Sequence, residues 1–168
     1  MEWTDTLMLD SFAAVSAGDS GAALDFTRVL PLPGITLLCA NVNSSDETSA
    51  ALKLLRGFRT SGRRVVLCNT YPLVAGKQFG QEVVEQGGAE LLVSCGISGR
   101  EVGIGARDAG LNLASVVVCT KPLSGGQVLA HRLAAGDVVM MLGFDEQSSD
   151  QVAQLLIDRF SAARAVAA

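Results

Sequence analysis

Short apolar runs alternate along the chain with segments of helical periodicity. The runs are rich in Val and Leu, and each is entered or left through turn residues, which is typical of buried strands. We expect strands at residues 35–40, 64–69, 90–94, 114–119 and 137–142. The patterns that separate and follow them predict helices at residues 46–60, 77–86, 99–109, 125–134 and 149–163. Strands that alternate with helices indicate βαβ units and a largely parallel sheet.

One further apolar run, residues 24–30, departs from this alternation. It is followed by Pro-Leu-Pro-Gly and then directly by the strand at 35–40. A connection this short cannot form a crossover, so the two strands should be antiparallel. The pattern therefore predicts a Rossmann-like, three-layer α/β/α domain with a six-stranded mixed, mostly parallel sheet. Because the strands are apolar almost throughout, we expect both faces of the sheet to be buried.

Length and composition fit this class. The chain has 168 residues, 49% hydrophobic and 18% charged, against about a quarter charged in an average domain. That size is typical of one domain with one core. Residues 1–20 do not follow the strand–helix pattern. We interpret them as the end of a preceding domain or a linker, and residues 21–168 as the domain itself.

The charge pattern excludes some classes of protein. The net charge is −4, the pI is near 4.9, and no basic cluster is larger than Arg63-Arg64, so nucleic-acid binding is not expected. No apolar run approaches the roughly eighteen residues that span a bilayer, and the N-terminus is acidic, unlike a signal peptide. We expect a cytoplasmic protein whose membrane association, if any, is made through partners.

Four cysteines fall at or just past the carboxyl ends of predicted parallel strands, at the edge where open α/β sheets bind ligands. They are Cys39, Cys68, Cys95 and Cys119. However, there is no CxxC pair, and the only histidine, His131, lies within a predicted helix, so the spacing of a zinc site is missing. We interpret the cysteines as small buried apolar residues and predict no metal site.

Two glycine-containing segments resemble phosphate-binding loops only in part. GISGREVGIG, residues 96–105, follows a strand and opens a helix, as a phosphate cradle would, but it lacks the GxGxxG pattern. Gly76-Lys77 does not complete a P-loop, because Tyr71 and Gln78 occupy the positions of its first glycine and its Ser/Thr. A single helical histidine also supports no catalytic triad. We therefore predict no catalytic residue and no activity for the chain alone.

A run of polar residues links the strand at 35–40 to the following helix. It contains Asn41, Asn43, Ser44, Ser45 and Asp46. In one interpretation the helix N-terminus there binds an anionic ligand. In the other, Ser44, Ser45 or Asp46 caps the helix, although neither Ser45 with Thr48 nor Asp46 with Ser49 forms a capping box, since the Glu is missing.

A second polar run, from Asn69 to Pro72, leaves the next strand at the same edge, so the two runs together predict a crevice. The candidate ligand-binding residues share this edge. They are Asn41, Asn43, Ser45 and Asp46 for positioning, Asn69 for a polar contact, and Lys77 for a phosphate or carboxylate.

The order of these segments resembles the C-terminal domain of the Mur ligase superfamily, nearest to the poly-γ-glutamate synthase branch. The resemblance extends from about Ser16 to Phe160. The segments that carry it are SAGDSGAAL, LLCANVNSSDETSAALKLL, RRVVLCNTYPLVAGKQFGQEVV, ELLVSCG and AGDVVMMLG. The family's Pro-Gly-x-Leu turn corresponds to residues 21–24, and its Asn-Asp followed by Ser-Thr to Ser45-Asp46 and Thr48-Ser49. Its strand-leaving Asn corresponds to Asn69, and its Gln-Phe to Gln78-Phe79.

The resemblance implies an ATP-dependent enzyme that joins a carboxylate to an amino acid. In such ligases a preceding central domain carries the P-loop and the magnesium site, and the C-terminal domain closes over ATP and brings in the amino acid. The implied cofactors of the complete enzyme are ATP and Mg²⁺. The implied partners are an amino-acid substrate and a P-loop central domain in the same or another chain.

The sequence also departs from the family. The loop after Asn69 reads TYPLVAG, almost uncharged, where the family has several Arg and Asp residues, and Ala23 stands where many members have Arg. The alternative hypothesis is therefore a degenerate, stand-alone ligand-binding or assembly module without catalysis.

Overall fold

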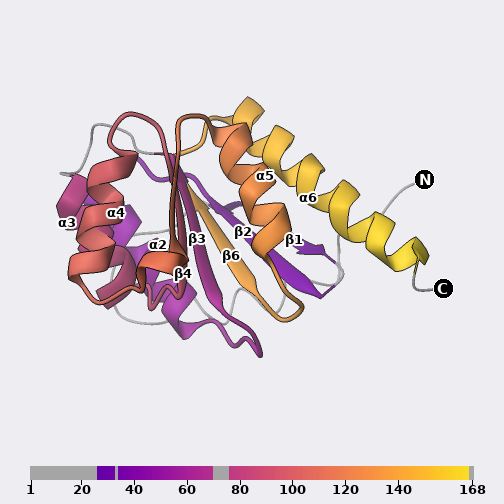
Figure 1. Ribbon diagram of the computed structural model, residues 1–168, viewed down its shortest axis with the longest axis horizontal. Coiled ribbons are helices and arrows are strands. Elements are labelled where there is room, and N and C mark those ends of the chain that lie inside the picture. The colour runs from indigo at the N-terminus through magenta and orange to yellow at the C-terminus, as the bar shows by residue number, and fades with distance from the viewer. Residues whose placement is uncertain (1–25, 33, 70–75, 167–168) are drawn as a thin grey trace.

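The structure, a computed structural model, describes residues 26–32, 34–69 and 76–166. Its elements form a sheet between two layers of helices (Figure 1). The strands are β1 (Phe26–Leu32), β2 (Ile35–Ala40), β3 (Arg64–Asn69), β4 (Leu91–Cys95), β5 (Val116–Cys119) and β6 (Val138–Leu142). The helices are α2 (Ser45–Gly57), α3 (Gly76–Glu85), α4 (Gly99–Asp108), α5 (Pro122–Arg132) and α6 (Glu146–Val166), with a 3₁₀ turn at Leu113–Ser115.

The strands lie in the order β1-β2-β6-β3-β4-β5. The five strands from β2 to β5 in this order run parallel, and β1 pairs antiparallel with β2, with Leu32 opposite Ile35. The predicted α/β architecture, a parallel sheet flanked by helices, is confirmed. β6, the last strand in the sequence, lies between β2 and β3 and is buried along its whole length.

Two helices start three residues earlier than predicted, β1 (predicted at 24–30) and β5 start two residues later, and the other starts differ by at most one residue. α5 begins at Pro122 rather than Gly125, because proline is well suited to the first position of a helix. α6 begins at Glu146 rather than Ser149. β5 begins at Val116 rather than Ala114, because residues 113–115 form a 3₁₀ turn that the Asn112 side chain caps by accepting a hydrogen bond from the backbone N–H of Ala114.

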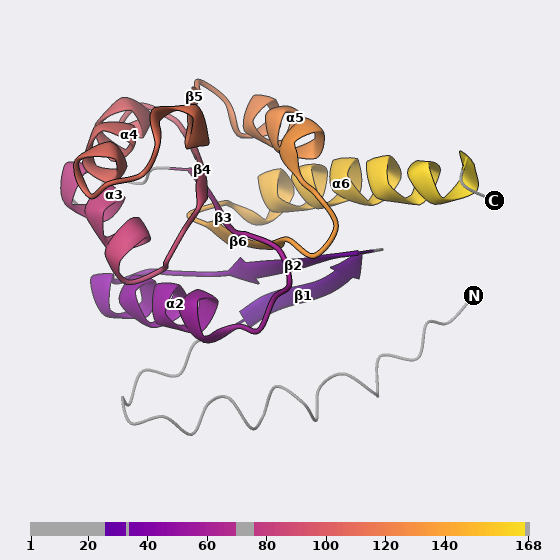
Figure 2. The same cartoon turned by 60° about the horizontal axis from the view of Figure 1, so that its bottom comes forward.

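The helices divide between the two faces of the sheet. Helices α2, α3 and α4 cover one face, where Leu38, Val66 and Met140 point. Helices α5 and α6 cover the other, where Leu37, Leu67 and Met141 point. Figure 2 shows α2 and the α5–α6 pair on opposite sides of the sheet. Alternate residues of each central strand thus fill two separate cores, as the apolar strands predicted.

Glycines let α3 and α4 approach each other closely. A Cβ atom on Gly80 would overlap the carbonyl oxygen of Val102, and one on Gly105 would overlap that of Lys77. Gly103 likewise lies against Val116 and Val118 of β5. Gly103 and Gly105, part of the segment 96–105 considered from the sequence as a phosphate cradle, therefore have a packing role in the structure.

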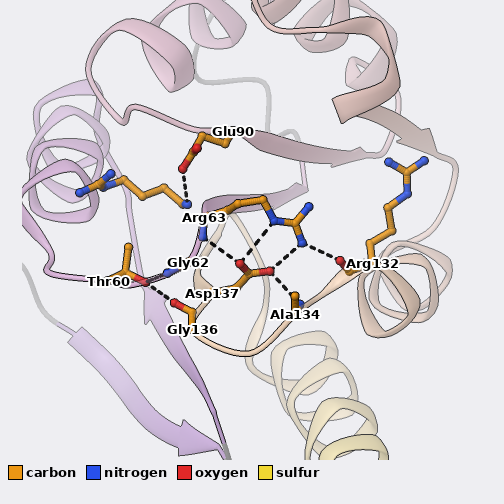
Figure 3. Close-up of polar contacts among 9 residues, drawn as sticks. Thr60, Gly62, Arg63, Glu90, Arg132, Ala134, Gly136 and Asp137 are labelled. Atoms are coloured by element: carbon orange, nitrogen blue, oxygen red, sulfur yellow. Dashed lines mark hydrogen bonds and ion pairs between the residues drawn. The ribbon is translucent and has the colours of Figure 1, made fainter.

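A polar network closes the amino edge of the sheet (Figure 3). Asp137 is 2% exposed, and its carboxylate accepts hydrogen bonds from the backbone N–H and the guanidinium of Arg63 and from the backbone N–H of Ala134. Arg63 also donates to the carbonyl of Arg132. Arg64 donates to the carbonyl of Leu55, in the last turn of α2, and to that of Phe58, the C-cap of the helix. The Arg63-Arg64 pair therefore has a structural role.

No helix among the described residues is both long enough and apolar enough to cross a bilayer. Residues 1–20, which we interpreted as the end of another domain or a linker, lie outside the described residues, as do the motif at 21–24 and the loop at 70–75.

Candidate functional site

The carboxyl ends of β2, β6 and β3 meet at a point where the chain leaves the sheet in opposite directions. The chain passes from β2 into α2 and from β3 into α3, both on one face, whereas β6 leads into α6 on the other. Open α/β sheets bind ligands at such switch points, because the diverging connections leave a crevice.

A crevice of about 280 Å³ lies at this point, on the face covered by α2, α3 and α4. Asn41, Asn43 and Asn69 are among the polar residues that line it. Its apolar lining comes mainly from Val42, Phe79, Val102, Leu142 and Phe144. The structure thus brings together three of the six candidate residues, from the two loops that the sequence indicated.

The cap of α2 is Ser44, in extended conformation, and not Asp46. Its hydroxyl accepts a hydrogen bond from the backbone N–H of Glu47 at 3.2 Å, and the Glu47 carboxylate accepts one from the backbone N–H of Asn43 at 2.6 Å. This is a variant of the capping box. The sequence analysis ruled out a box only for Ser45 with Thr48 and for Asp46 with Ser49, and it did not consider the pair Ser44 and Glu47.

The remaining residues of the loop divide into two groups. Asn41 and Asn43 are exposed and line the crevice, and their side chains make no hydrogen bond to another described residue. Ser45 and Asp46 are exposed in the first turn of α2 and do not line the crevice among the described residues. The geometry therefore makes Asn41 and Asn43 the accessible polar groups of this loop.

Asn69 and Gly143 hold the ends of β3 and β6 close together. Gly143 has a φ of +74°, and a Cβ atom there would overlap the carbonyl oxygen of Asn69. Glycine alone adopts this conformation without strain. The residues that follow it, Phe144 and Asp145, both contribute to the crevice lining.

Lys77 lies in the first turn of α3 and is engaged elsewhere. Its ammonium is 2.9 Å from the carboxylate of Asp108 on α4, and the hydrogen bond it donates holds the pKa of Asp108 below its ordinary value. Lys77 does not belong to the described lining of the crevice. The structure therefore does not bring this candidate cation to the asparagines.

Asp145, which the sequence analysis did not select, is the only charged side chain among the described residues that line the crevice. It caps α6, because its two carboxylate oxygens accept hydrogen bonds from the backbone N–H and the hydroxyl of Ser148, both at 2.8 Å. These bonds lower the pKa of Asp145. The sequence signal was an Asp three residues before a Ser, which we missed by starting the helix at Ser149.

The cysteines do not converge on one site. Cys68 faces the α2–α4 side of the sheet, whereas Cys39 and Cys95 face the α5–α6 side, and β6 separates β2 from β3. Burial raises the pKa of Cys95 to about 12 and also raises the pKa values of Cys68 and Cys119. The interpretation as packing residues is confirmed for the three at 3% exposure or less, Cys39, Cys68 and Cys95, and Cys119 is half-buried.

A second hollow, of about 600 Å³, opens on the α5–α6 side of the same edge. It shares Asn41, Phe144 and Asp145 with the crevice and adds Glu146 and Asp150. Within residues 26–32, 34–69 and 76–166, no group of three or more His, Cys, Asp or Glu side chains is arranged to hold a metal ion. His131 lies exposed in the last turn of α5.

Solved structures of Mur ligases share this fold. MurF ligase from Thermotoga maritima, in complex with ADP, matches 92% of the chain at 14% identity with a TM-score of 0.58. A UDP-N-acetylmuramoylalanyl-D-glutamyl-2,6-diaminopimelate–D-alanyl-D-alanyl ligase from Acinetobacter baumannii matches 83% at 10% identity, with a TM-score of 0.61. The match covers 37% and 30% of these two proteins, respectively.

A third match is a single domain from Haemophilus ducreyi. It comes from a putative ligase of UDP-N-acetylmuramate and a diaminopimelate-containing peptide, and almost the whole of this domain is matched. The match covers 82% of this chain and 99% of that domain, at 12% identity with a TM-score of 0.55. No protein-family model and no curated protein matches the sequence. The chain thus spans about a third of the length of the larger Mur ligases, and its likeness to them is one of fold.

Proposed function

We propose that the chain is the C-terminal domain of an ATP-dependent, amide-bond-forming ligase of the Mur type, nearest to the poly-γ-glutamate synthase branch. The observation that carries this proposal is the crevice at the switch point of a sheet whose fold is that of Mur ligases, lined by the three asparagines Asn41, Asn43 and Asn69. The sequence resemblance independently assigns ligand contacts to the same two loops.

The described residues do not offer a site for ATP or Mg²⁺ of their own. Asp145 is the only charged side chain in the described crevice lining, and Lys77 is paired with Asp108. One carboxylate does not suffice to hold Mg²⁺, which is bound through carboxylates together with phosphates and water. Triphosphate binding usually needs a glycine-rich loop with a lysine. In the proposed enzyme, both groups are held by the preceding P-loop domain.

The contribution of this chain is then positioning. Amide groups on the crevice rim orient the incoming amine, and closure of the domain over the P-loop domain excludes water from the acyl phosphate. The chain supplies orientation rather than proton transfer, in keeping with the lack of a nucleophile–base pair in the crevice among the described residues.

A reconstitution tests the proposal. The chain is joined to the P-loop domain that precedes it in the complete ligase, and ADP release with Mg²⁺ is measured with and without a panel of amino acids. We expect ADP release that depends on an amino acid and disappears when the chain is removed. Undiminished amide formation by the P-loop domain alone would overturn the proposal.

A stand-alone module is the second candidate. The observation that favours it is the lack of a cationic side chain among the described residues of the crevice lining, since the ligands of such ligases carry phosphate or carboxylate groups. A module would bind its ligand without stimulating ADP release, so the same reconstitution separates the two functions.

A further inference from the structure

The lining of the crevice indicates which chemical class of ligand it accepts. Its floor belongs to the core of the α2–α4 face, where Val102 is fully buried and Leu142 is 2% exposed. Phe79, Val42 and Phe144 continue the apolar surface toward the opening. The part of a ligand that contacts these residues exchanges water for hydrocarbon, which favours an apolar group there.

The charges around the crevice disfavour an anionic group. Asp145 is negative, and no described lining residue is positive. A side-chain carboxylate placed against the apolar lining would lose its hydration without gaining a cationic partner, and Asp145 would repel it.

The N-terminus of α2 does not compensate for the missing cation. Its first turn carries Asp46 and Glu47, and the Ser44 hydroxyl already accepts the hydrogen bond from the backbone N–H of Glu47. The Glu47 carboxylate itself occupies the backbone N–H of Asn43. Two acidic residues of the helix thus already balance the positive end of its dipole.

Asp145 is suited to bind an ammonium group. Its hydrogen bonds to Ser148 fix the carboxylate in one orientation at the start of α6. The carboxylate is exposed and lines the crevice, so it can form an ion pair with an ammonium group there. Asn41, Asn43 and Asn69 line the same crevice, and an asparagine side chain carries an oxygen that accepts hydrogen bonds.

We propose that the crevice binds a primary amine whose side chain is apolar and uncharged, of about the size of leucine, with the ammonium at Asp145 and the side chain against Val42 and Phe79. The volume of about 280 Å³ fits one amino acid rather than a larger ligand. The inference rests on the proposed function in that this amine is the incoming substrate of the ligase. This substrate differs from the glutamate that the resemblance to poly-γ-glutamate synthases would suggest, so the likeness to that branch would not extend to the incoming amine.

Three matched probes test the assignment on the full 168-residue chain by calorimetry or NMR titration. L-Leucinamide has the amine and the apolar side chain, 4-methylpentanamide lacks only the amine, and L-glutamic acid α-amide exchanges the side chain for a carboxylate. We expect L-leucinamide to bind at least about tenfold more tightly than either of the others, a difference of about 1.4 kcal/mol. Equal affinities, no measurable binding, or a preference for the glutamic acid α-amide would overturn the proposal.

A variant pair tests the role of Asp145. Asp145→Asn removes the charge but keeps a good helix cap, so the fold should persist while the preference for L-leucinamide over 4-methylpentanamide disappears. Asp158→Asn is the control, since Asp158 is exposed on the same helix outside the crevice and contacts Gln154. If Asp145→Asn binds L-leucinamide as tightly as the control does, the ammonium is not bound there.

The binding experiment fails independently of the ligase assay, because it contains neither ATP nor a P-loop domain. A reconstituted ligase that adds glutamate, with no L-leucinamide binding by the chain, would contradict this inference and leave the proposed function intact. Binding of L-leucinamide by a chain that supports no amide formation in the reconstitution would contradict the proposed function and leave the assignment of the crevice intact.

Discussion

At the residue scale, two short polar side chains fix the loops at opposite edges of the sheet. Ser44 caps α2 at the carboxyl edge, and Asp137 binds two loops at the amino edge through Arg63 and Ala134. Both make local or charge-assisted hydrogen bonds to backbone N–H groups that would otherwise lack partners. The asparagines of the crevice are different, since Asn41 and Asn43 make no side-chain hydrogen bond to another described residue.

The cap of α2 can be assigned by mutation. Ser44→Ala should lower the free energy of unfolding by about 0.5 to 2 kcal/mol, since it removes the acceptor of the Glu47 N–H. Asp46→Ala should cost less, about 0.3 to 1 kcal/mol, because Asp46 acts only through the helix dipole. Urea denaturation measures both values. A larger loss of unfolding free energy for Asp46→Ala than for Ser44→Ala would show that Asp46 is the cap.

Asp137 should make stability depend on acid pH. Although burial tends to raise its pKa, the hydrogen bonds from Arg63 and Ala134 hold it below the ordinary value. A carboxyl with a lowered pKa stabilises the fold above its unfolded pKa of about 3.9, and this contribution is lost as the pH falls through the folded value. The melting temperature of the wild-type chain should therefore decrease when the pH is lowered below about 4.

Asp137→Ala should remove this part of the acid dependence and cost about 2 to 4 kcal/mol at pH 7, because it leaves buried donors without an acceptor. Asp158→Ala, on the exposed side of α6, is the matched control and should change stability by less than about 0.5 kcal/mol. An Asp137→Ala chain as stable as the control would show that the network contributes little.

At the element scale, apolar runs located the strands well, whereas local side-chain chemistry set the helix ends. β2 and β3 have the predicted boundaries, since a buried strand leaves an uninterrupted run of Val and Leu. The start of α6 was missed by three residues, because it depends on one Asp145–Ser148 contact that periodicity does not register. The glycines of α4 were equally ambiguous, since close helix packing and phosphate binding require the same small residue.

The α3–α4 contact can be tested at one of these glycines. Gly80→Ala should destabilise the protein by about 1 to 3 kcal/mol or more, because the added methyl group overlaps the carbonyl of Val102. Gly57→Ala, at the end of α2, is the control: no atom lies within 4 Å of its added Cβ, so stability should stay equal or rise by up to about 1 kcal/mol. Similar denaturation midpoints for both variants would contradict the packing role.

The cysteines should behave as packing residues of the sheet. Burial raises the pKa of Cys68, so the folded chain should react slowly with a thiol reagent at neutral pH. Cys68→Ala should cost about 1 to 3 kcal/mol through the cavity it leaves. Rapid modification of Cys68 in the folded chain, detected by mass spectrometry, would contradict its burial.

At the scale of the whole molecule, the sequence predicted the class of fold and the edge that carries the crevice, but not the strand order. The insertion of β6 between β2 and β3 depends on contacts between residues far apart in the chain, which no local pattern encodes. That insertion brings Asp145 into the same crevice as the asparagines. Lys77 is paired with Asp108 across the α3–α4 contact and does not line the crevice among the described residues. Three candidate residues therefore line the crevice, while Ser45, Asp46 and Lys77 do not among the described residues.

The most direct test concerns Asn41, which is exposed on the crevice rim and should matter for ligand positioning but not for folding. The measurement is the rate of ATP-dependent amide formation by the complete ligase carrying Asn41→Ala, alongside its melting midpoint. We predict an unchanged midpoint and a rate lowered about tenfold, as expected for the loss of one positioning hydrogen bond. An unchanged rate at an unchanged midpoint would contradict the assignment of function to this edge of the sheet.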